Sequence, residues 1–356
     1  MASYKFPKCI LHIGIEKTGT TTLQTFLGAH RDALLRRGLF VPKALSPYSK
    51  LANHERLTTY ALRLDKLNDD LRIAAGLKSR EDVVKHRSHV LQHFEAEIIS
   101  TRPEPATTLL VSNEHCHSRL VEMDEVAALR DLLMTFSEQI KIIVYLRPQH
   151  ELATSLYDQA LKAGYFDIEI LPFLKPTGRQ WVSRRYFQYD DLLKRWTGIF
   201  GQENVRAKLF DRKQLYQNNI IDDFFREIGA SCDGLERTAD KNRTIGRTFQ
   251  RALNAINRFA SNNPGAITPV IRERLIELFS DGPKEAGKRP LREEAKIFLK
   301  EFGLGNEYVR EKFFPSLPAL FEPDMSDFPD QREPEISESD ALIRALLHLL
   351  SKRKWP

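Results

Sequence analysis

The sequence predicts an α/β protein of three layers, in which helices cover both faces of a central parallel sheet. Short apolar, β-branched runs alternate along the chain with longer segments of helical periodicity. Some of these runs, such as residues 140–146, are apolar at almost every position, which is typical of strands buried on both faces. Polar residues follow three of the runs directly, as expected at the carboxyl ends of parallel strands, where ligands bind.

The elements follow from these patterns in order along the chain. Residues 8–14 are the first buried strand, and a helix runs from Thr20 until Gly38 ends it. Further strands are expected at residues 39–42, 107–112, 140–146 and 204–210. Further helices are expected at residues 79–99, about 122–135, 148–164, 189–201 and about 212–228. Everything beyond Thr244 is helix and loop, and it ends in an amphipathic helix.

These elements predict one large domain, residues 1–321, with a helical insert at about 45–105 and a helical acceptor or lid region at about 245–321. Residues 322–356 are expected to be an acidic, proline-rich connection followed by the terminal helix. No apolar run approaches the roughly 18–20 residues of a membrane span. The N-terminus also lacks the long apolar stretch of a signal peptide. We therefore expect a cytoplasmic protein.

Composition limits the kinds of partner. The net charge of +6 suits an anionic ligand, but the basic residues are scattered among acids, so nucleic-acid binding is not indicated. Cys9, Cys116 and Cys232 are widely spaced and form no zinc pattern, so reduced thiols are expected. The histidines and acids also lack metal-ligand spacing, and no metal is predicted.

The first strand end has the outline of a phosphate-binding loop, "LHIGIEKTGTTTLQTFL". Gly14 and Gly19 allow a tight turn, and the helix from Thr20 offers unpaired N–H groups and a positive dipole end. Lys17 adds a mobile charge. In ATP and GTP loops, however, the lysine follows the last glycine. A kinase or NTPase, which would need Mg²⁺ and a strand ending in a carboxylate, is therefore the less favoured alternative.

The other two strand ends carry a candidate base and a candidate phosphate ligand. In "LLVSNEHCHSRL", Glu114, His115 or His117 could remove a proton from an attacking hydroxyl, and the pattern leaves open which of them faces the cleft. In "IKIIVYLRPQHELATSLYDQALK", Arg147 follows the strand and is well placed for bidentate phosphate recognition. Ser155 lies about two helical turns later.

Two of these motifs resemble those of a known enzyme family. "KTGTTTLQTFL" resembles the 5′-phosphosulfate loop of sulfotransferases that use 3′-phosphoadenosine 5′-phosphosulfate (PAPS). "YLRPQHELATSLYDQALK" resembles their Arg-x₇-Ser motif, which binds the 3′-phosphate. With "HIG" and "LLRRGLFVP", the likeness is to a bacterial branch and spans residues 9–321 unevenly. It implies a fold like that of P-loop nucleoside-triphosphate hydrolases, release of adenosine 3′,5′-bisphosphate, and no metal.

The resemblance also implies residue roles. Lys17 and Glu114 would be catalytic, and His54, His115 and His117 would contact the acceptor. The donor would be held by Lys17, Thr18, Gly19, Thr20, Thr21, Thr22, Arg147 and Ser155. A late basic residue, Lys241, Arg243 or Arg247, would close over the nucleotide. Cytosolic members carry Trp where this chain has Thr22, so the adenine contacts stay unassigned.

The bacterial likeness points to a carbohydrate or glycolipid acceptor. A non-catalytic nucleotide- or glycan-binding protein on the same fold is the second alternative. Oligomeric state stays open, because the terminal amphipathic helix suits packing on its own chain or on another.

Overall fold

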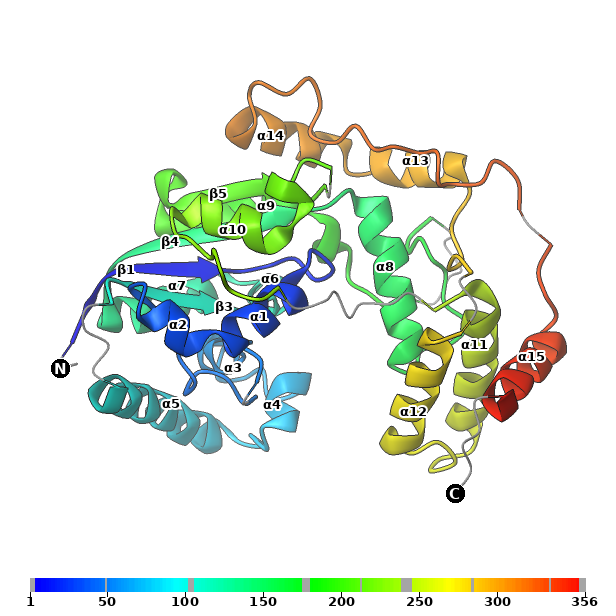
Figure 1. Cartoon of the computed structure of the whole chain (residues 1–356), viewed down its shortest axis with the longest axis horizontal. Helices are drawn as coiled ribbons and strands as arrows, with labels where there is room; N and C mark the ends of the chain where they lie inside the picture. Colours follow the sequence, from blue (N-terminus) through cyan, green and yellow to red (C-terminus); the bar gives the residue numbers. More distant parts are fainter. Residues whose placement is uncertain are drawn as a thin grey trace. The chain divides into compact units, whose positions relative to one another are not determined.

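A computed structural model describes residues 4–48, 50–101, 106–174, 180–211, 213–237, 245–282, 285–332 and 334–351 (Figure 1). The chain forms two compact units, each assembled from separate stretches of sequence. Unit 1 takes its residues from Met1–Arg147, Gln188–Ala239 and Tyr308–Pro318, and unit 2 from Pro148–Phe187, Asp240–Glu307 and Ala319–Pro356. The division at residue 321 stays a prediction.

Unit 1 contains a five-stranded, all-parallel sheet of order β2-β3-β1-β4-β5. The strands are β1 (Phe6–His12), β2 (Leu39–Phe40), β3 (Thr108–Ser112), β4 (Ser137–Leu146) and β5 (Val205–Leu209). β1 lies between β3 and β4, with His12 in register with Ser112 and Ile143. The three strands that precede the candidate site therefore end side by side. The predicted α/β class and parallel sheet are confirmed.

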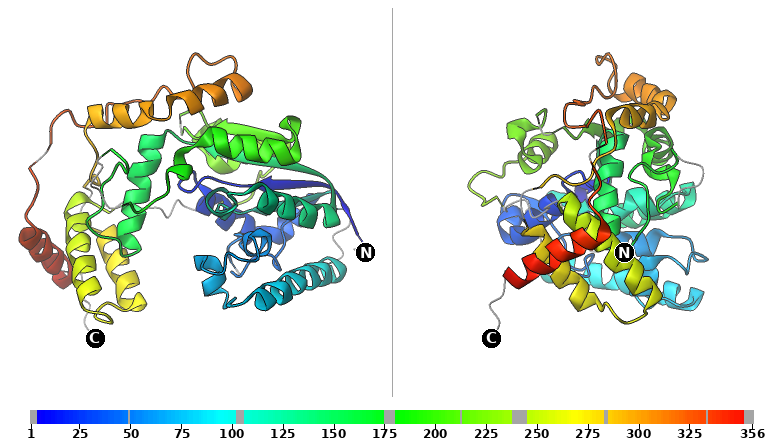
Figure 2. Two further views of the ribbon diagram at one scale, coloured as in Figure 1. Left: turned by 180° about the vertical axis from the view of Figure 1, so that it is seen from behind. Right: turned by 90° about the vertical axis from the view of Figure 1, so that its right-hand side faces the viewer.

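Helices cover both faces of this sheet, as the predicted three layers require. On one face, α1 (Thr20–Ala29) and α10 (Ile220–Ile228) pack on Ile10, Leu110 and Ile143 through residues such as Phe26 and Phe224. On the other, α7 (Met123–Phe136) packs on β4 and on α9 (Tyr189–Phe200). α1 lies in front of the strands in Figure 1, and α7 lies in front of them in the reverse view of Figure 2.

The remaining helices of unit 1 come mainly from the predicted insert. They are α2 (Arg31–Leu35), α3 (Arg56–Ala61), α4 (Asp70–Ala74), α5 (Arg80–Thr101) and α6 (His115–Arg119). The buried guanidinium of Arg72 donates to the carbonyls of Leu62 at 2.6 Å and Thr59 at 3.3 Å, which caps the end of α3. This contact fixes the chain that follows Asn53 and His54.

Two expected helices differ from the structure. The helix from Thr20 breaks at His30 and continues as α2 before Gly38, whose φ of +83° ends it. The helix expected at 212–228 begins only at Ile220. Gln217 and Asn218 have left-handed φ angles of +52° and +54°, and Asn219 caps α10 by accepting from the Ile221 amide.

Unit 2 is helical. It contains α8 (Gln149–Lys162), α11 (Arg247–Asn262), α12 (Pro269–Ser280), α13 (Arg292–Lys300) and the terminal helix α15 (Glu338–Ser351). α11 packs against α8 and α15, and α13 packs against α8. α14 (Gly303–Phe313) begins in unit 2 and ends in unit 1. Among the described residues, every helix is too short or too polar to cross a membrane.

Candidate active site

The turn between β1 and α1 has the backbone of an anion-binding loop. Gly14, Lys17 and Gly19 all have positive φ angles, of +28°, +68° and +76°. Gly19 is the N-cap residue of α1, and because it has no side chain it cannot cap the first-turn amides itself. The positive end of the α1 dipole therefore meets this loop. Lys17 holds a left-handed conformation that costs a non-glycine residue about 1–2 kcal/mol.

The threonines of the loop differ in their contacts and in their exposure. Thr18 is buried, and both its hydroxyl and its amide donate to the carbonyl of Ile15, at 2.6 and 3.3 Å. Thr20 is also buried, whereas Thr21 is exposed and Thr22 is partly exposed. Thr18 therefore stabilises the turn. Contact between these threonines and a sulfuryl donor stays a prediction.

Arg147, at the end of β4, lies against the loop. Its Nη1 donates to the carbonyl oxygen of Lys17 at 3.0 Å, and its guanidinium lies over the ring of Phe210. Its own carbonyl accepts from the Tyr189 hydroxyl at 2.6 Å, which fixes the turn after the strand. The structure thus brings together Lys17 and Arg147, which follow neighbouring strands and are two of the residues predicted to bind the sulfuryl donor.

Glu114 lies at the third strand end as the N-cap residue of α6, partly buried. Its Oε2 accepts from Gln24 Nε2 at 2.5 Å, and its Oε1 lies 3.4 Å from Asn53 Nδ2. Burial raises the pKa of the carboxyl, against the Gln24 hydrogen bond and the charge of Lys17, which lower it. A carboxyl with a raised pKa beside the charge of Lys17 is suited to act as a general base.

The three predicted histidines occupy different environments. His54 is fully buried: its Nδ1 accepts from the Ser112 amide at 2.9 Å, and its Nε2 lies 3.0 Å from the Pro42 carbonyl oxygen. Burial lowers its pKa to about 4, so it joins backbone segments as a neutral ring. His117 is buried within α6. His115 is partly exposed, and its Nε2 lies 3.9 Å from Glu55 Oε2. These positions favour His115 over His54 as an acceptor contact, a role that stays a prediction.

The remaining candidates belong to unit 2 or lie outside the described residues. Ser155 is partly buried on α8, and its pairing with Arg147 stays a prediction. Lys241 and Arg243 lie outside the described residues. Arg247 begins α11, and its Nε donates to Glu285 Oε1 at 2.7 Å.

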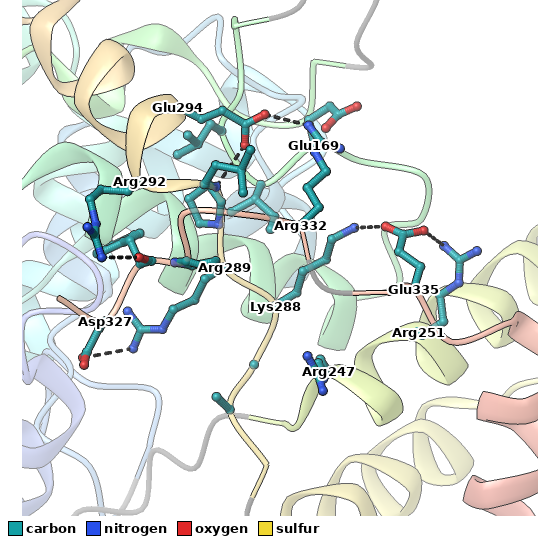
Figure 3. A pocket seen from close by; sticks show the side chains of 18 of the residues that line it. Glu169, Arg247, Arg251, Lys288, Arg289, Arg292, Glu294, Asp327, Arg332 and Glu335 are labelled. Carbon is teal, nitrogen blue, oxygen red and sulfur yellow. Dashed lines mark hydrogen bonds and ion pairs between the residues drawn. The ribbon is translucent and has the colours of Figure 1, made fainter. Parts of the chain in front are cut away.

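Arg247 also lines a hollow of about 1320 Å³ within unit 2 (Figure 3). Its walls carry basic side chains that are paired with acids. Figure 3 shows Lys288 and Arg251 both reaching Glu335, at 3.0 and 3.7 Å. Arg332 similarly contacts Glu294 at 2.7 Å. These pairs join α11 and residues 285–294 to the connection before α15. Acidic and basic side chains are nearly equal in number in the lining.

Sequence reasoning missed Gln24 and Asn53, the residues that hold Glu114. Gln24 Nε2 also lies 3.3 Å from Ser112 Oγ, which is 2.9 Å from His12 Nδ1. Gln24 interrupts the apolar face of α1. A polar residue at such a buried position is the feature of the sequence that could have indicated a role for Gln24. Asn53 comes from the insert and carried no signal. Within the described ranges, no three His, Cys, Asp or Glu side chains meet in a group that could hold a metal ion.

Known proteins share only limited similarity with this chain. No family model matches the chain. An uncharacterized protein from Archaeoglobus fulgidus is 26% identical over 175 residues, which are 49% of this chain and 46% of that protein. The match thus spans about half the length of this relative. A crystal structure of a sulfotransferase from Alicyclobacillus acidocaldarius superimposes with a TM-score of 0.42 at 16% identity, over 71% of this chain and 94% of that one.

Proposed function

We propose that this chain is a sulfotransferase that moves the sulfuryl group of PAPS to an acceptor hydroxyl on a carbohydrate or glycolipid. The observation that carries the proposal is the hydrogen bond from Arg147 to the Lys17 carbonyl. It supports a site in which the arginine of the motif resembling a 3′-phosphate site lies beside the loop resembling a 5′-phosphosulfate site. A donor phosphorylated at both positions is the ligand that both motifs would serve.

The chain's residues would divide the chemistry in a simple way. First-turn amides of α1 and the helix dipole would hold the 5′-phosphate, and Arg147 would hold the 3′-phosphate. The acceptor oxygen bonds to sulfur as the bond from sulfur to the bridging phosphate oxygen breaks. Adenosine 3′,5′-bisphosphate leaves with that electron pair, and Lys17 stabilises its growing negative charge. Glu114 takes the proton from the acceptor hydroxyl.

Transfer of ³⁵S-sulfate from labelled PAPS to a panel of oligosaccharide and glycolipid acceptors tests the proposal. Lys17→Ala should lower kcat by about 10²–10³-fold, because the charge on the leaving oxygen is no longer neutralised. The control is Lys85→Ala on α5, an exposed lysine of the same unit, which should leave kcat unchanged. Equal turnover in Lys17→Ala and the wild type would rule out this role for the loop.

A further inference from the structure

We propose that Tyr48, Asn53, Glu55 and His115 form an acceptor wall beside Glu114, and that this wall selects a neutral or amino-bearing polyhydroxyl over an anionic acceptor. The inference rests on the proposed sulfotransferase function and adds the chemical class of its acceptor.

The side chains of the wall come from two segments of unit 1, and they form two contacting groups. The Tyr48 hydroxyl donates to Glu55 Oε2 at 3.2 Å, and His115 Nε2 lies 3.9 Å from the same oxygen. Asn53 Nδ2 reaches Glu114 Oε1 at 3.4 Å. Burial, Glu55 and the charge of Glu114 together raise the pKa of the Tyr48 phenol, so Glu114 acts on this residue as well.

Two buried amides beside Glu114 point to a missing hydrogen-bond donor. Asn53 is 5% exposed and Gln24 is 1% exposed. The amide nitrogen of each contacts the Glu114 carboxylate, yet Asn53 Oδ1 and Gln24 Oε1 have no partner among the described residues. Amide oxygens share a carbon with their nitrogens, so both lie close to the carboxylate. Buried polar atoms are nearly always satisfied, so each of these oxygens calls for one O–H or N–H donor, which a water molecule or an acceptor hydroxyl can supply.

The charges around the wall disfavour an anionic acceptor. Burial lowers the pKa of His115, whereas the negative charges of Glu16, Glu55 and Asp69 oppose that shift. Arg119, the positive group that acts on this histidine, is held by Asp69 at 3.0 Å. A carboxylate or sulfate on the acceptor would therefore meet like charges, while a hydroxyl or ammonium group would donate to them.

Tyr48 supplies the apolar part of the wall. The residue is 48% exposed, although its hydroxyl is held by Glu55. A half-exposed tyrosine ring that is anchored at its hydroxyl offers rigid contact area at low conformational cost, and the apolar face of a pyranose ring suits it.

Binding of three trisaccharides, measured by ligand-observed NMR with saturating adenosine 3′,5′-bisphosphate, tests the inference apart from catalysis. The probes are neutral triacetylchitotriose, amino-bearing chitotriose and anionic trigalacturonate. We expect the first two to bind at least tenfold more tightly than trigalacturonate at low salt. Tyr48→Ala should weaken the binding of triacetylchitotriose and chitotriose about tenfold. Glu55→Lys should reduce the difference in affinity between these two sugars and trigalacturonate. The control, Tyr216→Ala, removes a tyrosine of similar exposure (42%) and should change nothing.

Equal or tighter binding of trigalacturonate, absence of binding by all three sugars, or wild-type affinities in Tyr48→Ala would overturn the inference. Failure of the proposed function has a different signature, which is loss of adenosine 3′,5′-bisphosphate binding by the wild type in a separate titration.

Discussion

At the scale of single residues, the proposed chemistry depends on the pH at which Glu114 ionises, and the hydrogen bond from Gln24 shifts that pH. Its Nε2 donates to the carboxylate at 2.5 Å, which favours the charged form. Gln24→Met removes that bond, so the pKa of Glu114 should rise further. A base must be ionised to act, so the acidic limb of the kcat/KM profile should move to higher pH. Gln159→Met, an exposed substitution on α8, is the control and should leave the limb in place.

Replacing Glu114 should change activity and stability in opposite directions. Its pKa is raised by burial, so the folded state favours the protonated form, and stability is lost as pH rises through the folded pKa. At neutral pH, Glu114→Gln should therefore raise Tm while lowering kcat by about 10²–10⁴-fold. Thermal denaturation and turnover measured together test this, with Glu273→Gln on α12 as an exposed control. A lower Tm in Glu114→Gln would contradict the burial argument.

At the scale of elements, the loop leaves no space for a side chain at Gly14. Its φ is +28°, and a Cβ there would lie 2.5 Å from Thr20 Cγ2. Gly14→Ala should displace the start of α1, weaken binding of adenosine 3′,5′-bisphosphate by at least tenfold, and destabilise the fold by about 1–3 kcal/mol. Calorimetry and urea denaturation measure both effects.

Gly76→Ala is the matched control for this prediction. Gly76 also has a positive φ, of +74°, but a Cβ there would meet nothing within 4 Å. The Gly76→Ala variant should be destabilised by backbone strain but should bind adenosine 3′,5′-bisphosphate as tightly as the wild type. Equal ligand binding in the two variants would show that the loop tolerates a side chain at Gly14.

Element prediction succeeded where one periodicity extended over the whole segment. All five strands were found because their apolar, β-branched runs are bounded by glycine, proline or polar residues. The expected helix at 212–228 was wrong over its first half, because the left-handed turn at Gln217 and Asn218 depends on local backbone geometry that helical spacing does not encode. α6 is a single turn, too short to produce a periodic signal.

At the scale of the whole molecule, strand order explains why residues from distant segments meet. Lys17, Glu114 and Arg147 are far apart in sequence, but β1 lies between β3 and β4, so their strand ends are neighbours. The sequence predicted these three positions from local motifs. Gln24 and Asn53 could not be assigned in advance, because their partner Glu114 comes from another element and only the folded chain brings them together. The sequence also did not predict that each of the two compact units is assembled from separate stretches of the chain.

Isothermal titration calorimetry with adenosine 3′,5′-bisphosphate, 5′-AMP and ATP with Mg²⁺ tests the central claim most directly. A site that serves both phosphates of a PAPS donor predicts that adenosine 3′,5′-bisphosphate binds without added metal. It should bind at least tenfold more tightly than 5′-AMP, and Arg147→Ala should reduce that difference. Tight binding of ATP with Mg²⁺ and none of adenosine 3′,5′-bisphosphate would contradict the claim and favour a kinase or NTPase.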